Sequence, residues 1–306
     1  MGQRVIVITG TTCSGKSYLG LKLAQLLNGE IISADSRQIY KKLCIGTAKP
    51  SATELQKVKH HFIDILNPDE DYDANKFSIQ AEKVINEIQD KNITAVVVGG
   101  SGLYIKALIE GIIESAVKDE DLREILLSKK QKYGVEFLYT ELKKVDPVSS
   151  EKMLPQNWKR VIRALEVYHL TGRPIWQHHI NQNKIPKFNF YQIGLNWDRE
   201  VLYRRVEERV DEMIGKGLVE EVKSILDDGY DKNLNSLNTV GYKEIISYLE
   251  DEITLDRAIE LIKRNTRRYA KRQLTWFRAD ERIKWINVSS QEGINNLTLQ
   301  LIKDID

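Results

Sequence analysis

The stretch Gly10-Thr11-Thr12-Cys13-Ser14-Gly15-Lys16-Ser17 fits the phosphate-binding loop pattern G-x-x-x-x-G-K-[ST] in full. An apolar run, residues 5–8, precedes it, and a helix-like run from Ser17 to Leu27 follows it. This strand–loop–helix order is the context in which the pattern indicates phosphate binding. Glycines allow successive backbone N–H groups and the helix N-terminus to point at phosphate oxygens. We therefore expect a pyrophosphate site, with Lys16 on a terminal phosphate and the Ser17 hydroxyl as a Mg²⁺ ligand.

Two further segments, residues 30–33 and 95–98, have the apolar character of buried parallel strands. Ligands bind at the carboxyl ends of such strands, so Asp35, after the first of them, should face the phosphate loop. Three roles remain open for Asp35: a general base, a Mg²⁺ ligand through water, or the cap of a helix from Ser36 onward. The second strand ends in residues 99–102, Gly-Gly-Ser-Gly, where backbone can approach a ligand. It lacks the acidic residue that a typical ATPase carries there.

The α/β rhythm is interrupted after Gly111, and the pattern is helical from Asp119 to about His179. Strand character returns at residues 191–195, and the final strand is expected at 283–288. The sequence thus predicts an α/β fold of the P-loop NTPase type, with a parallel sheet of about five strands flanked by helices. An all-helical subdomain is inserted in it. We place the core at residues 1–115 and 190–306 and the insertion at residues 116–189.

A basic stripe lies near the C-terminus, in a predicted helix. Residues 264, 267, 268, 271 and 272, all Arg or Lys, fall along one helix face at three- and four-residue spacing. Such a face can follow a phosphate backbone, or it can simply be solvated. Tyr269, Trp276 and Phe277 lie between these charges, and we expect them to anchor the core rather than to stack on bases.

Composition indicates an ordinary globular protein: 42% of the 306 residues are hydrophobic, 29% are charged, and the net charge is +2. Cys13 and Cys44 form neither a disulfide framework nor a metal-like pair, which favours the cytoplasm. The five histidines have no metal-ligand spacing, so zinc is not expected. No apolar stretch approaches the length of a membrane span, and we expect no association with membranes.

Seven blocks carry a resemblance to a known family: residues 32–40, 45–50, 60–64, 99–104, 163–167, 240–244 and 271–276. Together they resemble the tRNA dimethylallyltransferase family, from about residue 4 to about residue 288. The resemblance implies transfer of a dimethylallyl group from dimethylallyl diphosphate to the exocyclic amine of the adenosine 3′-adjacent to the tRNA anticodon. Diphosphate is released, and Mg²⁺ is the expected cofactor. The phosphate loop would then hold the prenyl diphosphate rather than ATP, which accounts for the missing hydrolytic acid.

The same resemblance suggests roles for individual residues. Asp35 would be the catalytic base, Lys16 and Ser101 would act at the leaving group, and the helical insertion would grip the anticodon arm. The chain departs from the family pattern at Cys13, where Ala is frequent, at Ser101, where Thr is frequent, and at Lys159, where Gln is frequent. The candidate tRNA contacts are Asp35, Ser36, Arg37, Gln38, Ser101, Arg123, Lys159, Arg160 and Arg163.

Some alternatives stay open at this stage. Arg163 could instead form an ion pair with Glu166 or Glu207. The whole chain could be a nucleotide kinase, a prenyltransferase acting on free AMP or ADP, or an RNA-binding module without chemistry. We expect a monomer that acts on the anticodon stem-loop of tRNA.

Overall fold

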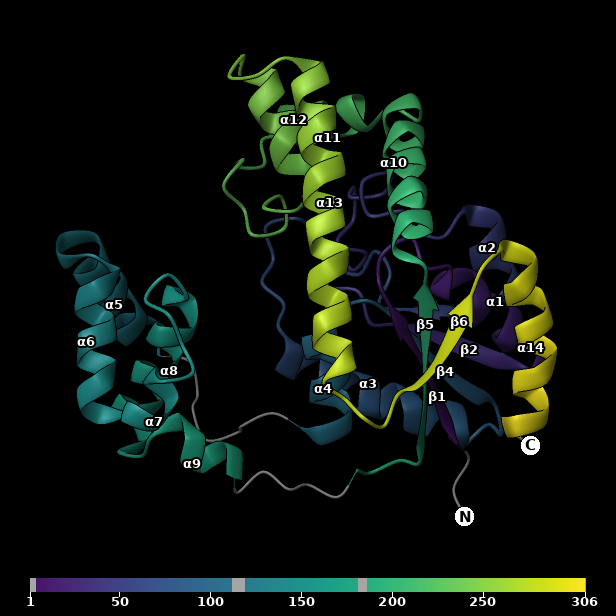
Figure 1. The fold of residues 1–306 in the computed structure, drawn as a ribbon, viewed down its shortest axis with the longest axis horizontal. Helices are drawn as coiled ribbons and strands as arrows, with labels where there is room; N and C mark the ends of the chain where they lie inside the picture. Colours follow the sequence, from purple (N-terminus) through teal and green to yellow (C-terminus); the bar gives the residue numbers. More distant parts are fainter. Residues whose placement is uncertain (1–3, 112–118, 181–185, 306) are drawn as a thin grey trace. The chain divides into compact units, whose positions relative to one another are not determined.

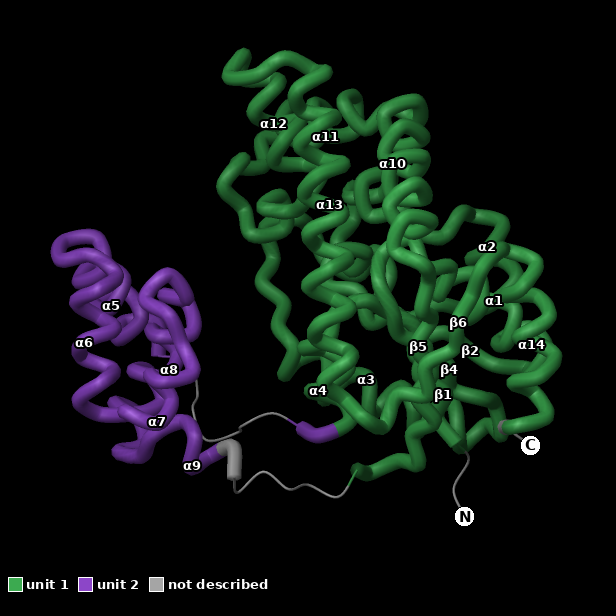
Figure 2. Tube along the Cα trace, in the orientation of Figure 1, with its two compact units in different colours: residues 1–109, 186–306 green, residues 110–185 purple. Residues whose placement is uncertain are grey.

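The computed structural model describes residues 4–111, 119–180 and 186–305 of the chain. It divides into two compact units, Met1–Ile109 with Pro186–Asp306, and Glu110–Ile185 (Figure 2). The first unit contains the sheet, and the second consists of helices. The helical unit begins and ends a few residues before the expected bounds of the insertion, residues 116 and 189.

The sheet has six strands in the order β3-β2-β4-β1-β5-β6, and all neighbouring pairs are parallel (Figure 1). In the centre, Ile8 of β1 lies opposite Val98 of β4 and Ile193 of β5. The strands expected from the sequence are all present, and β3 is an additional one that was not expected, because it has two residues and a pair of histidines gives no apolar pattern. The strands are β1 Val5–Gly10, β2 Gly29–Ser33, β3 His60–His61, β4 Thr94–Val98, β5 Phe190–Trp197 and β6 Lys284–Val288.

Helices cover both faces of this sheet, which confirms the predicted α/β fold. The β1-to-β2 and β3-to-β4 connections run in opposite directions across the sheet, so right-handed crossovers put α1 and α3 on opposite faces. The helix α14 joins α1 in a shared apolar core. The helices of this part are α1 Lys16–Leu26, α2 Ala52–Lys57, α3 Ala74–Gln89, α4 Gly102–Glu110, α10 Arg199–Gly215, α11 Leu218–Asp227, α12 Tyr242–Leu249, α13 Leu255–Arg278 and α14 Gln291–Ile305.

The helices α10 to α13 lie together toward the end of the sheet to which the β5 and β6 arrows point in Figure 1. Because all strands are parallel, this is the edge where every strand ends and where ligands bind in such folds. Two of the four helices begin at side-chain caps: Asp198 accepts from the N–H groups of Glu200 and Val201, and Thr254 accepts from that of Arg257. The caps fix where α10 and α13 start, and so which of their faces meets the sheet edge.

The helical unit has its own core, formed by leucines, valines and isoleucines of α5, α6 and α8. The buried Asp146 ties its shorter helices together, since Oδ1 accepts from Ser149 N at 2.9 Å and Oδ2 accepts from Ile175 N at 3.1 Å. Gly172, with φ 68°, ends α8 as expected from the sequence. The helices are α5 Glu120–Tyr133, α6 Val135–Val145, α7 Pro147–Ser150, α8 Trp158–Thr171 and α9 Ile175–Ile180.

Candidate active site

The phosphate loop leaves β1 and enters α1 through residues with positive φ. Cys13 has φ 62° and Gly15 has φ 85°, and Ser14 N donates to Thr11 O at 3.3 Å. Gly15 is the N-cap of α1 and supplies no side-chain acceptor, so the first N–H groups of this helix remain available for an anion. The loop therefore has the backbone shape that the sequence pattern predicts.

Lys16 lies deep in the site. Its Nζ donates to Thr11 O at 3.1 Å, which bends the side chain back over the loop. Burial lowers the pKa of Lys16 to about 8; the nearby Asp35 carboxylate opposes the shift, and the Arg209 guanidinium adds to it. The ammonium group is thus poorly solvated and is poised to gain from a phosphate partner.

A pH dependence of diphosphate binding follows from this pKa. Without ligand, Lys16 loses its charge as the pH rises through about 8, so a diphosphate ester should bind about tenfold more weakly at pH 9 than at pH 7. Titration calorimetry measures this directly. The control is Lys16→Arg, whose side chain stays charged and should flatten the profile. An affinity that is constant in the wild type from pH 7 to pH 9 would contradict the assignment.

Asp35 follows β2 and holds a turn, not a helix. Its Oδ1 accepts from Arg37 N at 2.9 Å and from Gln38 N at 3.4 Å, and residues 36–39 form the turn. The helix from Ser36 onward that one of the three alternatives required is therefore absent, although the capping contact itself exists. One carboxylate oxygen serves the turn, and the carboxylate also lines the cavity that contains Lys16.

The glycine-rich loop after β4 lies against this turn. Ser101 Oγ accepts from Ser36 N at 2.9 Å, so the hydroxyl proton of Ser101 is still available for donation. A Cβ on Gly99 would lie 2.1 Å from Ala34 O, which explains the need for glycine at this close approach. On its other side the loop meets α13, because Gln273 Nε2 donates to Gly100 O at 2.9 Å while its Oε1 accepts from Thr12 N at 2.8 Å.

These segments enclose a cavity of about 370 Å³. Among the residues expected from the sequence, it brings together Thr12, Lys16, Ser17 and residues 35–38. Ser101 does not line this cavity but contacts the lining residue Ser36. The cavity therefore joins the phosphate loop and Asp35 in one space.

Sequence reasoning missed the wall that α10 and α13 contribute. The polar groups of this wall come from Arg209, Tyr269 and Arg272. Desolvation, together with the charge of Asp35, raises the pKa of Tyr269 to about 12. The four-residue spacing of Arg205 and Arg209 was a signal, since it puts both on one face of α10. The apolar part of the wall consists of Val206, Val210, Met213 and Ile262.

The same helix stabilises the phosphate loop from outside. Arg205 Nε donates to Cys13 O at 2.9 Å, and its guanidinium lies 4.4 Å from the centroid of the Trp197 ring. Trp197 Nε1 donates to Ser14 O at 2.8 Å. Two loop carbonyls thus point away from the cavity toward α10 and β5, which leaves the N–H groups on the ligand side.

The basic stripe on α13 is partly neutralised within the protein. Lys263 pairs with Asp211, and Arg267 pairs with Glu207 at 2.6 Å, whereas Arg268 and Lys271 are exposed. The prediction of core anchors is confirmed for Phe277, which is 3% exposed. It was wrong for Tyr269 and Trp276, which are 37% and 47% exposed: Tyr269 lines the cavity, and the Trp276 indole lies over Gly102.

In the helical unit, two candidate tRNA contacts meet on one carboxylate. Glu166 is 1% exposed and accepts from Arg123 Nη1 at 2.8 Å and from Arg163 Nη1 at 3.4 Å. Of the two partners left open for Arg163, the structure shows Glu166. Lys159 and Arg160 are exposed at the start of α8.

The fold and the site together define a P-loop α/β protein whose phosphate loop opens into a partly apolar cavity. No helix among the described residues is long and apolar enough to cross a membrane. A family model, IPP transferase, matches residues 38–280. The tRNA dimethylallyltransferase of Alkaliphilus oremlandii is 45% identical over 99% of this chain and 97% of its own length.

Two solved structures are also similar. The tRNA isopentenylpyrophosphate transferase of Bacillus halodurans has a TM-score of 0.73 and 38% identity, covering 99% of this chain and 97% of its own. A eukaryotic dimethylallyltransferase acting on tRNA has a TM-score of 0.84 and 28% identity, covering 98% of this chain and 78% of its own. The chain belongs to the tRNA dimethylallyltransferase family, and it is a prenyltransferase.

Proposed function

We propose that the cavity binds dimethylallyl diphosphate and the adenine 3′-adjacent to the anticodon of tRNA at the same time. A bond forms between the exocyclic nitrogen and the allylic carbon, while the bond from that carbon to oxygen breaks and diphosphate leaves. The nitrogen loses a proton to Asp35. The observation that carries the proposal is the presence of Lys16, Asp35 and an apolar wall in one cavity.

Each part of the cavity has a task in this reaction. An exocyclic amine is a weak nucleophile, so a carboxylate that accepts its proton during bond formation lowers the barrier. Charge grows on the diphosphate oxygens, and the loop N–H groups and Lys16 stabilise it, with the Ser101 hydroxyl as a further donor. The prenyl tail fits the apolar side chains of α10 and α13. An adenine inside a stacked loop cannot reach Asp35, so it is flipped into the cavity.

Mg²⁺ suits the oxygen atoms at the cavity floor. Ser17 and Asp35 both line the cavity, and no group of three or more His, Cys, Asp or Glu in the described parts of the chain could hold a metal. Mg²⁺ characteristically takes one or two protein oxygens, substrate phosphates and water, which fits this sparse donor set. The Ser17 hydroxyl would hold the ion, which would neutralise charge on the leaving diphosphate.

Each of the two units carries candidate contacts for the tRNA. In the helical unit the candidates are Arg123, Lys159, Arg160 and Arg163, and near the cavity they are residues 35–38 together with Ser101. The exposed cations of α13 would follow the RNA backbone. Since one chain supplies the whole cavity, we propose that a monomer acts, and that it acts in the cytoplasm, where tRNA is matured.

The role of α13 in binding RNA can be measured through salt dependence. Neutralising the exposed Arg268 and Lys271 with glutamine should lower the slope of log K against log salt by about 0.7–0.9 per lost phosphate contact. The matched control is Lys263→Gln with Arg267→Gln, because both cations already pair with α10 and should change the slope less. Equal slopes for the wild type and the Arg268/Lys271 variant would assign these two side chains to solvation.

The activity is tested by incubating the protein with dimethylallyl diphosphate, Mg²⁺ and unmodified tRNA, followed by mass analysis of the nucleosides. We expect dimethylallyl-adenosine, and none when the adenosine after the anticodon is replaced. AMP and ADP serve as rival acceptors, and ATP with nucleosides tests for a kinase. Transfer to free nucleotides alone, phosphoryl transfer, or RNA binding without product would each contradict the proposal.

A further inference from the structure

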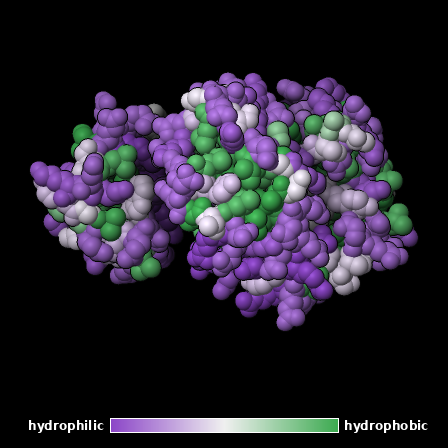
Figure 3. All heavy atoms as spheres, turned by 90° about the horizontal axis from the view of Figure 1, so that it is seen from above, coloured by the Kyte–Doolittle hydropathy of each residue, from purple (hydrophilic) through white to green (hydrophobic). Residues whose placement is uncertain are grey.

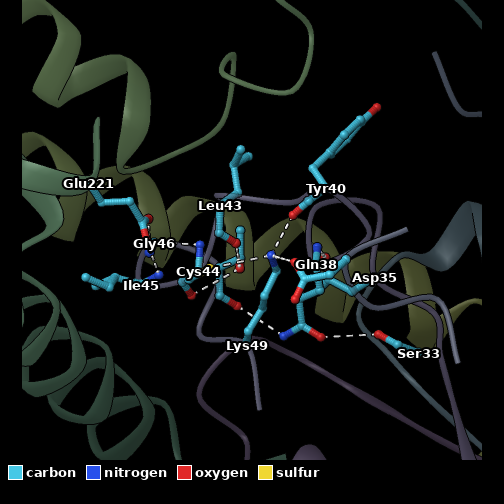
Figure 4. Close-up of polar contacts among 12 residues, drawn as sticks. Ser33, Asp35, Gln38, Tyr40, Leu43, Cys44, Ile45, Gly46, Lys49 and Glu221 are labelled. Carbon is cyan, nitrogen blue, oxygen red and sulfur yellow. Dashed lines mark hydrogen bonds and ion pairs between the residues drawn. The ribbon is translucent and has the colours of Figure 1, made fainter. Parts of the chain in front are cut away.

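Glu221 of α11 accepts hydrogen bonds from the loop of residues 44–46, which follows the turn of Asp35 in the sequence. Its Oε2 accepts from Cys44 N at 3.0 Å and Ile45 N at 2.7 Å, and its Oε1 accepts from Gly46 N at 3.2 Å. Tyr242 Oη donates to Oε1 at 2.7 Å. Three consecutive backbone N–H groups (Figure 4) and the hydroxyl of the buried Tyr242 thus converge on one carboxylate.

The loop held in this way is a cavity wall. Gly46, Thr47 and Ala48 line the cavity that contains Lys16 and Asp35, whereas Glu221 does not. Gly46 also lies close to the ring of Tyr242, where an added Cβ would be 2.5 Å from a ring carbon. Glu221 therefore fixes the direction of the backbone N–H groups in this loop, and the Tyr242 ring limits how far Gly46 can move toward it.

From the wall, hydrogen bonds continue to Asp35. Gln38 Nε2 donates to Thr47 O and to Ala48 O, both at 3.1 Å, and Gln38 Oε1 accepts from Ser33 Oγ at 3.2 Å. The backbone N–H of Gln38 then donates to Asp35 Oδ1 at 3.4 Å. Both amide protons of Gln38 are used by the loop, so the orientation of this side chain depends on where the loop lies (Figure 4).

We propose that Glu221 is a positioning residue for prenyl transfer: it holds residues 44–46, and through Gln38 it keeps Asp35 in the orientation that accepts the proton. This rests on the proposed function of Asp35. A carboxylate is suited to the task because its two oxygens accept four hydrogen bonds. A glutamine amide of the same size has only one acceptor oxygen, and its NH₂ group would face the N–H donors of the loop. The phosphate loop lies outside this network and should be unaffected.

The test compares Glu221→Gln with Glu220→Gln, a matched change at the exposed neighbour on the same helix. For Glu221→Gln we expect faster amide hydrogen exchange at residues 44–46, since their acceptor is lost. The value of kcat should fall by about 10²-fold, because a small misplacement of reacting groups has an effect of this size. The Kd for dimethylallyl diphosphate should stay within about twofold of the wild-type value. Glu220→Gln should match the wild type in all three measurements.

Several results would overturn the proposal. Unchanged exchange at residues 44–46, or a kcat equal to that of Glu220→Gln, would remove Glu221 from the reaction. A parallel loss of dimethylallyl diphosphate affinity would show general damage rather than positioning. If Glu221→Gln does not fold, Tyr242→Phe keeps the ring and removes one donor; a lower kcat with unchanged diphosphate affinity supports the proposal, and an unchanged kcat overturns it. If the wild type itself transfers no prenyl group, the proposed function fails, while hydrogen exchange still decides whether Glu221 holds the loop.

Discussion

Asp35→Asn is expected to lower the rate of prenyl transfer by about 10²–10⁴-fold while the affinities for dimethylallyl diphosphate and tRNA stay close to those of the wild type. The amide keeps the size of the side chain and an oxygen that can accept from Arg37 N and Gln38 N. It cannot take the proton of the adenine amine. Single-turnover kinetics with preformed complexes measure this step apart from binding and product release.

The same substitution separates the three roles that the sequence leaves open for Asp35. If the carboxylate mainly organises Mg²⁺, the variant should bind the diphosphate poorly and recover at high Mg²⁺. If it only caps the turn, asparagine should replace it with little loss, because the two residues cap about equally well. Rescue by metal, or a rate near that of the wild type, would contradict the assignment of Asp35 as the base.

Lys16→Ala is expected to lower the rate by about 10²–10³-fold and to weaken binding of dimethylallyl diphosphate. A charge-assisted contact at the leaving group is worth about 2–4 kcal/mol of transition-state stabilisation, and this contact disappears with the ammonium group. Steady-state kinetics and calorimetry on the same preparation measure both effects. Lys22→Ala, later on the same helix α1, is the control. A Lys16→Ala enzyme with a normal rate would remove the phosphate loop from the mechanism.

The central part of the fold could be predicted because its signals are local. The run at residues 5–8 and the glycines of the loop determine a strand, a turn and a helix start within about twenty residues, and β1 and α1 follow. The strand β3 could not be predicted, since a two-residue strand has no periodicity and forms only because β2 offers it an edge. A helix cap was one of the three roles left open for Asp35; its Oδ1 makes the capping contacts, but residues 36–39 form a turn rather than a helix.

The cavity wall was harder to predict because it is assembled from distant segments. Gln273 meets Thr12 and Gly100 across more than 170 positions of the chain; it lies in the family block 271–276, but its spacing gives no sign that it contacts the phosphate loop. The aromatic residues of α13 illustrate the same limit. Phe277 is buried, whereas Tyr269 and Trp276 stay partly exposed although they lie at heptad spacing from the buried Ile262, so only the packing around α13 distinguishes them. Figure 3, viewed from the side of α10 to α13, shows a patch of hydrophobic side chains surrounded by polar ones.

A structure of the protein bound to tRNA, diphosphate and Mg²⁺ tests the proposed reaction most directly. We expect the adenine after the anticodon to be flipped into the cavity, with its exocyclic nitrogen within about 3.2 Å of an oxygen of Asp35. The diphosphate should lie on the N–H groups of residues 12–17 with Lys16 beside it. An adenine that remains stacked in the anticodon loop, or a diphosphate bound away from the phosphate loop, would contradict the account.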